Sequence, residues 1–264
     1  MSLSVFWHYV RLRLKERLEY RGAFLIGMGA QMLAYCATYL VTWMLLQRFE
    51  TISGWGWPEV AFLYSLNLLT YALGAAFTFS QMTALEQMVT RGTFDGVLIR
   101  PLNPYLALAA QMFNVGYLGH VILSAGVLFW AATQLDIAWS ARNVIFLSLS
   151  IASGMFIQAG LLTLLGAWAF LFIRSSFLFS LYGALRGFIS YPISVYGTLI
   201  QLLLTAVLPL AFVNFYPSTI LLSREGQMLP GWVGWLTPLI GPLFFWLSYE
   251  LWMRGVNRYQ GAGG

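Results

Sequence analysis

Few residues in this sequence have side chains that could carry acid–base, nucleophilic or metal chemistry. The 264 residues include two histidines, His8 and His120, and one cysteine, Cys36. A single cysteine cannot form a thiolate metal cluster, and the histidines lack the H-E-x-x-H spacing of zinc hydrolases. The only lysine, Lys15, is followed by a glutamate, so the chain has no G-x-x-x-x-G-K-[ST] phosphate loop. We therefore predict no catalytic residue and no metal site, and we do not expect an enzyme.

Five side-chain amides lie within otherwise apolar segments. An amide in an apolar environment needs a hydrogen-bond partner, which a substrate or a neighbouring helix can supply. His120 lies in a similar setting, where ionisable side chains are often functional. Both roles, a substrate pathway and helix–helix hydrogen bonding, stay open for His120 and for the candidate pathway residues. These candidates are Asn67, Asn114, Gln158, Gln201 and Asn214.

The elements that carry these residues are predicted to be membrane-spanning helices. Apolar residues make up 59% of the chain and charged residues 9%, whereas soluble domains carry about 25% charged residues. A soluble protein of this size could not bury so much apolar surface. We expect a single all-α membrane domain over residues 1–264. Its six transmembrane helices are predicted at about 22–47, 58–82, 105–133, 143–173, 193–213 and 232–253.

The basic residues predict that both termini face the cytoplasm. In this orientation 11 of the 14 Lys and Arg residues lie inside and 3 outside, as the positive-inside rule favours. The inside residues are Arg11, Arg13, Lys15, Arg17, Arg21, Arg91, Arg100, Arg174, Arg186, Arg254 and Arg258, and the outside ones are Arg48, Arg142 and Arg224. Pro192 divides the apolar run after Arg174, so we expect residues 174–191 to form a cytoplasmic segment along the membrane surface. Basic residues at membrane boundaries favour lipid contacts over nucleic acid.

The N-terminal residues 1–21 are predicted to form an amphipathic helix on the membrane surface. Phe6, Trp7, Val10 and Leu14 follow helical spacing and share one face. Arg11 and Lys15 lie on the opposite face, as in helices that rest on lipid headgroups. The alternative is a charged tail that only fixes the orientation of the first span.

Residues 83–104, which we call the coupling segment, form the longest charged stretch after the N-terminus. A simple connection needs only a few residues, whereas this segment mixes charges with aliphatic residues, as do short helices that dock on a partner. The alternative is a solvated loop. The predicted span interiors are nearly free of acids, which carriers driven by ion gradients usually need. We therefore expect the energy for transport to come from another polypeptide.

The run from Gly92 to Pro104, GTFDGVLIRPLNP, resembles the cytoplasmic loop of permease subunits in the type-two ABC transporter superfamily, within a largely uncharacterised bacterial branch. Residues 174–176, residues 191–193 and Pro217 extend the resemblance over nearly the whole chain. It implies six spans, an N-terminal elbow helix and a re-entrant extracellular loop at 214–231. It also implies that ATPase subunits, which hold ATP and Mg, contact the coupling segment. The expected contact residues are Glu86, Arg91, Phe94, Asp95, Leu98, Arg100 and Pro101.

By this resemblance the chain is expected to pair with a second permease, either a related chain or a copy of itself, in the cytoplasmic membrane of a bacterium. The expected function is ATP-driven export. Spans rich in Phe, Leu, Trp and Met suggest an amphipathic or lipid-like cargo, unless these residues only face lipid. The alternative functions are a non-transporting assembly or regulatory subunit and an intramembrane lipid-modifying enzyme. The enzyme would need clustered acids or histidines, which the sequence does not offer.

Overall fold

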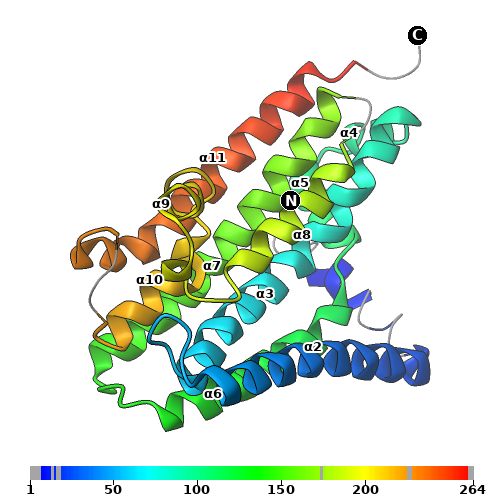
Figure 1. The fold of residues 1–264 in the computed structure, drawn as a ribbon. Coiled ribbons are helices and arrows are strands. Elements are labelled where there is room, and N and C mark those ends of the chain that lie inside the picture. Colours follow the sequence, from blue (N-terminus) through cyan, green and yellow to red (C-terminus); the bar gives the residue numbers. More distant parts are fainter. Residues whose placement is uncertain (1–6, 13–14, 16–18, 173–174, 225–227, 261–264) are drawn as a thin grey trace.

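The computed structural model describes residues 7–12, 15, 19–172, 175–224 and 228–260. These residues form helices joined by turns, with one isolated β-bridge between Ile52 and Trp55. Figure 1 shows several long helices lying side by side as a bundle, with α2 running across one side of it. Together with the apolar helices described below, this confirms the predicted all-α membrane class.

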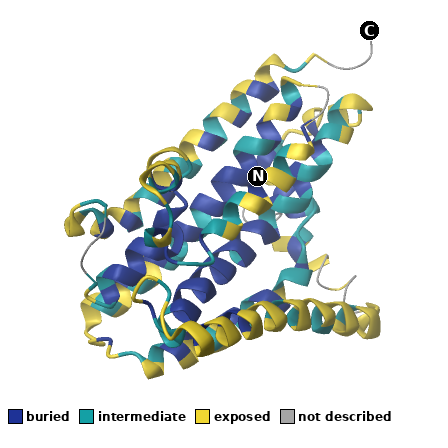
Figure 2. Ribbon diagram, in the orientation of Figure 1, coloured by how far each residue is buried: buried dark blue, intermediate teal, exposed yellow. Residues whose placement is uncertain are grey.

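Three helices form the centre of the bundle. They are α3 (Trp57–Thr90), α7 (Ala141–Ala167) and α11 (Thr237–Arg258), and α7 packs against both of the others. Figure 2 shows α3 buried along most of its length and α7 buried mainly in its second half. Close packing of α7 and α11 depends on a glycine, because a Cβ at Gly241 would overlap Ser153. The Gly241 N–H also donates to Ser153 Oγ at 2.9 Å.

Helix α2 (Arg21–Phe49) lies along one side of the bundle and is mostly exposed (Figures 1 and 2). Its buried residues are Tyr39, Thr42 and Leu46. The Tyr39 hydroxyl lies 2.8 Å from Ser65 Oγ of α3 and hydrogen-bonds to it. The remaining surface of α2 is largely apolar, which in a bilayer suits contact with lipid or with another membrane protein.

Within the described residues, four helical stretches are long and apolar enough to cross a membrane: Arg21–Phe49, Trp57–Thr90, Val115–Gln134 and Ala141–Phe170. A bent pair, Thr198–Val207 and Ala211–Leu221, makes a fifth if it is counted as one broken span. Helix α11 has 22 residues but carries charged residues in its second half. The 34 residues of α3 extend over about 51 Å, more than the ~30 Å hydrocarbon core. One end of α3 must therefore project from the membrane.

The third predicted span, 105–133, is not one helix, and the expectation of a continuous helix was wrong. The chain forms α5 (Pro104–Gln111), leaves the helical path at residues 112–114, and resumes as a 3-10 turn (Val115–Tyr117) and α6 (Leu118–Gln134). Asn114 explains the break. Its Oδ1 accepts the Gly116 N–H at 2.9 Å, and its own N–H donates to Ala76 O of α3 at 3.0 Å, so its backbone bonds outside the helix.

Residues 175–221 also differ from expectation. Helix α8 (Phe177–Phe188) packs against α7 with Tyr182 buried, which is not the packing of a helix that lies only along a surface. The predicted fifth span, 193–213, is divided into a 3-10 turn (Ile193–Val195), α9 (Thr198–Leu202), a π-helical turn (Leu203–Val207) and α10 (Ala211–Leu221). The stretch Thr198–Val207, which comprises α9 and the π-helical turn, meets α10 at a bend of 104°. Pro209 lies in this bend, where its ring prevents a continuous helix.

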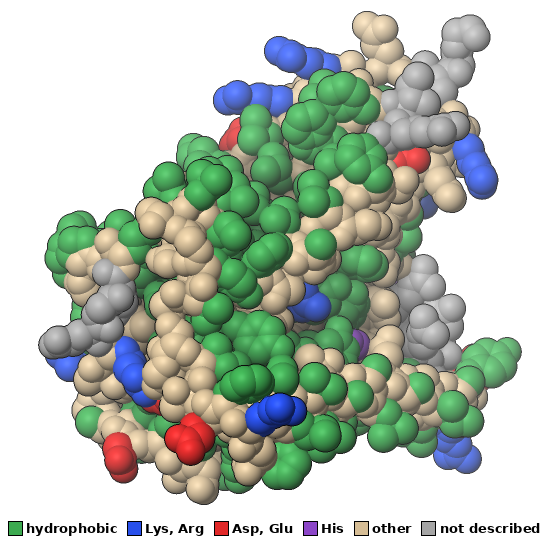
Figure 3. All heavy atoms as spheres, viewed as in Figure 1, with side chains coloured by type: hydrophobic (Ala, Val, Ile, Leu, Met, Phe, Trp, Pro, Cys, Tyr) green, Lys and Arg blue, Asp and Glu red, His purple; other side chains and the backbone are tan. Residues whose placement is uncertain are grey.

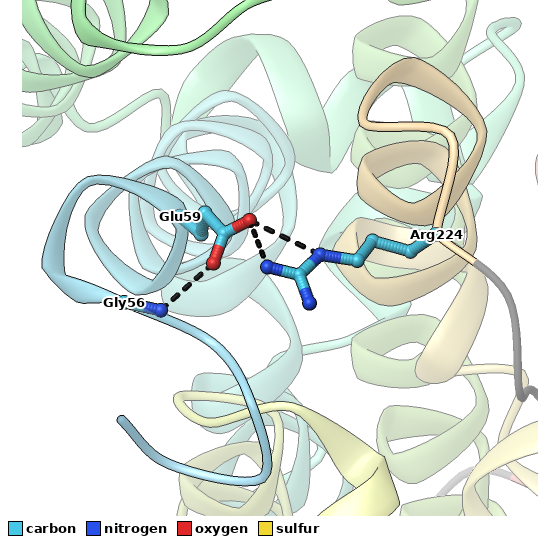
Figure 4. Close-up of polar contacts among 3 residues, drawn as sticks. All are labelled: Gly56, Glu59 and Arg224. Atoms are coloured by element: carbon cyan, nitrogen blue, oxygen red, sulfur yellow. Dashed lines mark hydrogen bonds and ion pairs between the residues drawn. The ribbon is translucent and has the colours of Figure 1, made fainter. Parts of the chain in front are cut away.

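An ion pair joins the start of α3 to the end of α10 (Figure 4). Glu59 Oε2 accepts the Gly56 N–H at 2.7 Å and so caps α3. Glu59 Oε1 accepts hydrogen bonds from Arg224, one of them from Nε at 3.1 Å. The Arg224 guanidinium also lies 5.5 Å from the centre of the Trp55 ring. We call Gly56, Glu59 and Arg224 the clasp; it lies at the end of α3 opposite the coupling segment.

Candidate functional site

The coupling segment is a folded projection and not a solvated loop. Helix α3 continues to Thr90, the chain turns at Gly92 with φ of +70°, and the short helix α4 (Asp95–Leu98) follows. A positive φ favours glycine because it lacks Cβ. Asn103 then starts α5, since its Oδ1 accepts the Leu106 N–H at 3.1 Å. The segment therefore begins and ends on helices of the bundle.

Phe94 fixes this projection to the bundle. Its side chain is 0% exposed and makes edge contacts with Phe170, Trp252 and Tyr259, with ring centres 5.3, 6.3 and 5.4 Å away. Val97 of α4 is buried in the same cluster. Phe94 was predicted to contact an ATPase, but its side chain is buried against other residues of this chain. Its role in the described structure is to attach the coupling segment to the ends of α7 and α11.

The opposite face of the projection is exposed and mixes charged with apolar side chains. Ile99, which is 83% exposed, belongs to this exposed surface but was not among the predicted contact residues. Phe94 and Val97 are three residues apart, so in a helix they share one buried face, and the residues between and after them are exposed. This spacing in the sequence could have predicted that Ile99 is exposed. The predicted contact residues on this face are Arg91, Asp95, Leu98, Arg100 and Pro101.

Glu86, also predicted as a contact residue, is engaged within the chain. Its Oε2 accepts the backbone N–H groups of Ser175 and Ser176, both at 2.6 Å. These groups lie at the start of α8, where a helix presents free N–H donors and a positive dipole end. The Ser175 N–H is the main cause that lowers the Glu86 pKa below its ordinary value. Glu86 thus ties α8 to α3 just beyond the predicted span 58–82.

A polar cavity lies between α2, α3 and the start of α6. Its volume is about 480 Å³, and Figure 3 shows the molecule hollowed above α2, with a basic side chain inside. None of the described residues that line the cavity is acidic. They are Gln31, Tyr35, Tyr71, Phe79, Ser80, Thr83, Asn114, Gly116, Tyr117 and His120, and we call the space the tyrosine cavity.

Arg186 of α8 lies next to this cavity, because it contacts Tyr71, one of the lining residues. Its guanidinium carbon lies 3.8 Å from the centre of the Tyr71 ring, a cation–π contact. No carboxylate among the described residues forms an ion pair with Arg186. His120 stands against the rings of Tyr35 and Tyr117, with centres 4.7 and 5.2 Å apart. The cavity therefore offers hydroxyl, amide and imidazole groups, with the cation of Arg186 held against one of its tyrosine rings.

The family described as ABC-2 family transporter protein matches residues 32–263. The chain belongs to the ABC-2 transporter family. The match confirms the resemblance carried by residues 92–104, and makes this chain a membrane component of an ABC transporter. No curated protein and no solved structure matches it.

Among the predicted pathway residues of this ABC-2 chain, Asn114 lines the tyrosine cavity. Asn67, Gln158 and Tyr182 instead form a buried chain across α3, α7 and α8. Gln158 Nε2 donates to Asn67 Oδ1 at 3.3 Å, and the Tyr182 hydroxyl donates to Gln158 Oε1. These contacts match the alternative role of helix–helix hydrogen bonding.

Asn214 and Gln201 bond to backbone. Asn214 Nδ2 donates to Leu63 O at 3.1 Å and to Ile189 O at 2.6 Å, which connects α10 with α3 and with the chain after α8. Gln201 Nε2 donates locally to Tyr196 O at 2.7 Å. Neither residue lines the tyrosine cavity.

The predicted elbow is described only in part. Residues 7–12 are helical. Val10 is buried, whereas Trp7, Arg11 and Lys15 are exposed. Phe6 and Leu14 lie outside the described residues.

Proposed function

We propose that this chain is the permease subunit of an ABC exporter that is driven by a separate ATPase docked on the coupling segment. The observation that carries the proposal is the exposed face of this segment, held in place by the buried side chain of Phe94. Charged and apolar groups on a rigid projection suit a docking surface. The family assignment makes an ATPase the expected partner.

The proposed complex keeps the predicted topology of six spans, an elbow helix and cytoplasmic termini. The fifth crossing is then made by α8 and α10, with residues 193–207 between them, and α11 is the sixth. The complex is proposed to lie in the cytoplasmic membrane of a bacterium. Two permeases pair with two ATPases, which hold ATP and Mg, and the cargo is amphipathic.

The contacts of the coupling segment indicate how ATP binding would act on the spans. Phe94 contacts Phe170 and Trp252, which lie at the ends of α7 and α11. Glu86 holds the start of α8. Displacement of the segment by the ATPase would therefore move four helices together. Such movement can shift a two-state equilibrium between inward and outward access.

Affinity purification of the full chain, co-expressed with its ATPase, tests this proposal. We expect the two to co-purify and to hydrolyse ATP. The double variant D95A/R100A should lose bound ATPase while keeping its membrane insertion. R142A changes an exposed arginine at the opposite end and serves as the control. If D95A/R100A retains as much ATPase as R142A, the docking face is assigned wrongly.

A further inference from the structure

We propose that the tyrosine cavity binds the anionic group of an amphipathic molecule, with Arg186 as the counter-charge. This inference rests on the proposed function, because it assigns the charge of the cargo or of a bound lipid. It depends on three features of the described residues: the lone cation, the hydrogen-bonding groups around it, and the position of the cavity along α3.

The first feature is the cation. Arg186 is half-buried on α8, flanked by Tyr182 and Ile189, both of which are buried. Its guanidinium faces the Tyr71 ring at 3.8 Å, and the described residues supply no carboxylate to neutralise it. A charge removed from water needs a partner, and charged groups at such depth usually mark a ligand path. A cation–π contact alone leaves the positive charge in place to attract an anion.

The second feature is the set of groups that can bind the anion. Tyr35 and Tyr117 carry hydroxyls, and Gln31 and Asn114 carry amides, on walls supplied by α2 and by the break before α6. His120 is buried, and its Nδ1 has no hydrogen-bond partner among the described residues. A buried polar atom without a partner costs free energy, which a ligand can recover. No described acidic residue lines the space, so a cationic ligand would find no opposite charge there.

The third feature is position. The cavity extends along α3 from Tyr71 to Thr83, which is about 18 Å of helix. Thr83 is the first residue of the coupling segment, so in the proposed topology the cavity occupies the cytoplasmic half of the membrane. One wall is α2, whose remaining surface is exposed and apolar. A headgroup can therefore enter the cavity while its hydrocarbon chain stays against α2.

Binding to the purified full chain, with its ATPase where it co-purifies, tests the inference. The protein in a neutral detergent is titrated with short-chain phosphatidylglycerol, short-chain phosphatidylcholine and inorganic phosphate, and bound ligand is counted by native mass spectrometry. We expect phosphatidylglycerol to bind at least about tenfold more tightly than phosphatidylcholine, as removal of one charge-assisted contact implies. R186Q should abolish this preference, and R186K should restore part of it.

Two further variants keep the test decisive if R186Q does not fold. Y35F removes one hydroxyl from the cavity and should reduce phosphatidylglycerol binding, whereas the control R48Q, an exposed arginine at the end of α2, should not. Equal binding of the two lipids, or an unchanged preference in R186Q or Y35F, overturns the inference. Phosphate binding as tight as that of phosphatidylglycerol, and lost in R186Q, supports the anion site but overturns the amphipathic ligand. ATPase co-purification, measured on the same samples, tests the proposed function separately.

Discussion

Replacement of Phe94 by alanine should detach the coupling segment from the bundle. Truncation of a fully buried Phe costs about 3–5 kcal/mol through lost transfer free energy and the cavity left behind. The side chain is 0% exposed and contacts three aromatic rings, so we expect a value in the upper half of that range. Each such aromatic pair contributes about 0.5–1.5 kcal/mol beyond area burial. Because the segment is small, the loss should appear as local opening and not as unfolding of the whole protein.

Hydrogen exchange measured by mass spectrometry on the detergent-solubilised chain provides the assay. In F94A, peptides covering residues 91–103 should exchange at least about a hundredfold faster, since each 1.4 kcal/mol of lost local stability gives a factor of ten. Peptides from the middle of α3 should be unchanged. I99A is the matched control, because Ile99 is 83% exposed. It should leave exchange unchanged while weakening ATPase docking.

If F94A and I99A give equal exchange in the coupling segment, the anchoring role of Phe94 is refuted. A milder variant, F94L, keeps most of the buried volume and should fall between wild type and F94A. Loss of ATPase binding in I99A with normal exchange would distinguish docking from anchoring.

Three other variants test separate contacts. E86Q should remove a pH dependence of thermal unfolding: the Glu86 pKa is lowered, so its contribution is present at neutral pH and is lost as the pH falls from about 5 through the folded pKa. Unchanged acid sensitivity in E86Q would contradict this. R224A should leave Glu59 Oε1 without its ion-pair partner and cost about 1–3 kcal/mol, seen as faster exchange at the end of α10. G241A should destabilise the chain by about 1–3 kcal/mol through overpacking, because its Cβ would overlap α7, whereas G183A faces open space and should be neutral.

The long apolar runs were enough to predict those helices that continue from end to end without a break. Residues 22–47 and 143–173 correspond closely to α2 and to the helical stretch Ala141–Phe170. Charged residues end these runs, and hydroxyls inside them, such as those of Thr42 and Thr163, donate to carbonyls of the same helix. The third span was mispredicted because Asn114 lies in an equally apolar run. Its break depends on a bond to Ala76 O of α3, a long-range contact that hydropathy does not contain.

The role of α8 was missed for a related reason. Arg186 was counted as a cytoplasmic surface charge, because arginines between two spans usually lie on the cytoplasmic side of the membrane. In the structure it faces Tyr71, more than a hundred positions earlier in the chain, and Tyr182 of the same helix bonds Gln158. Aromatic and amide partners for a buried helix are scattered through the sequence, so only the packing of α3, α7 and α8 brings them together.

Helix α3 is one uninterrupted rod with a fastening at each end. Glu59, near its start, holds Arg224 beside α10, and Glu86, near its other end, holds the beginning of α8. These residues are about 40 Å apart along the helix. A tilt of roughly 10° about the midpoint would move both ends by about 3–4 Å in opposite directions. A displacement of the Glu86 end of α3 can thus change the contact between Glu59 and Arg224 at the other end of the helix.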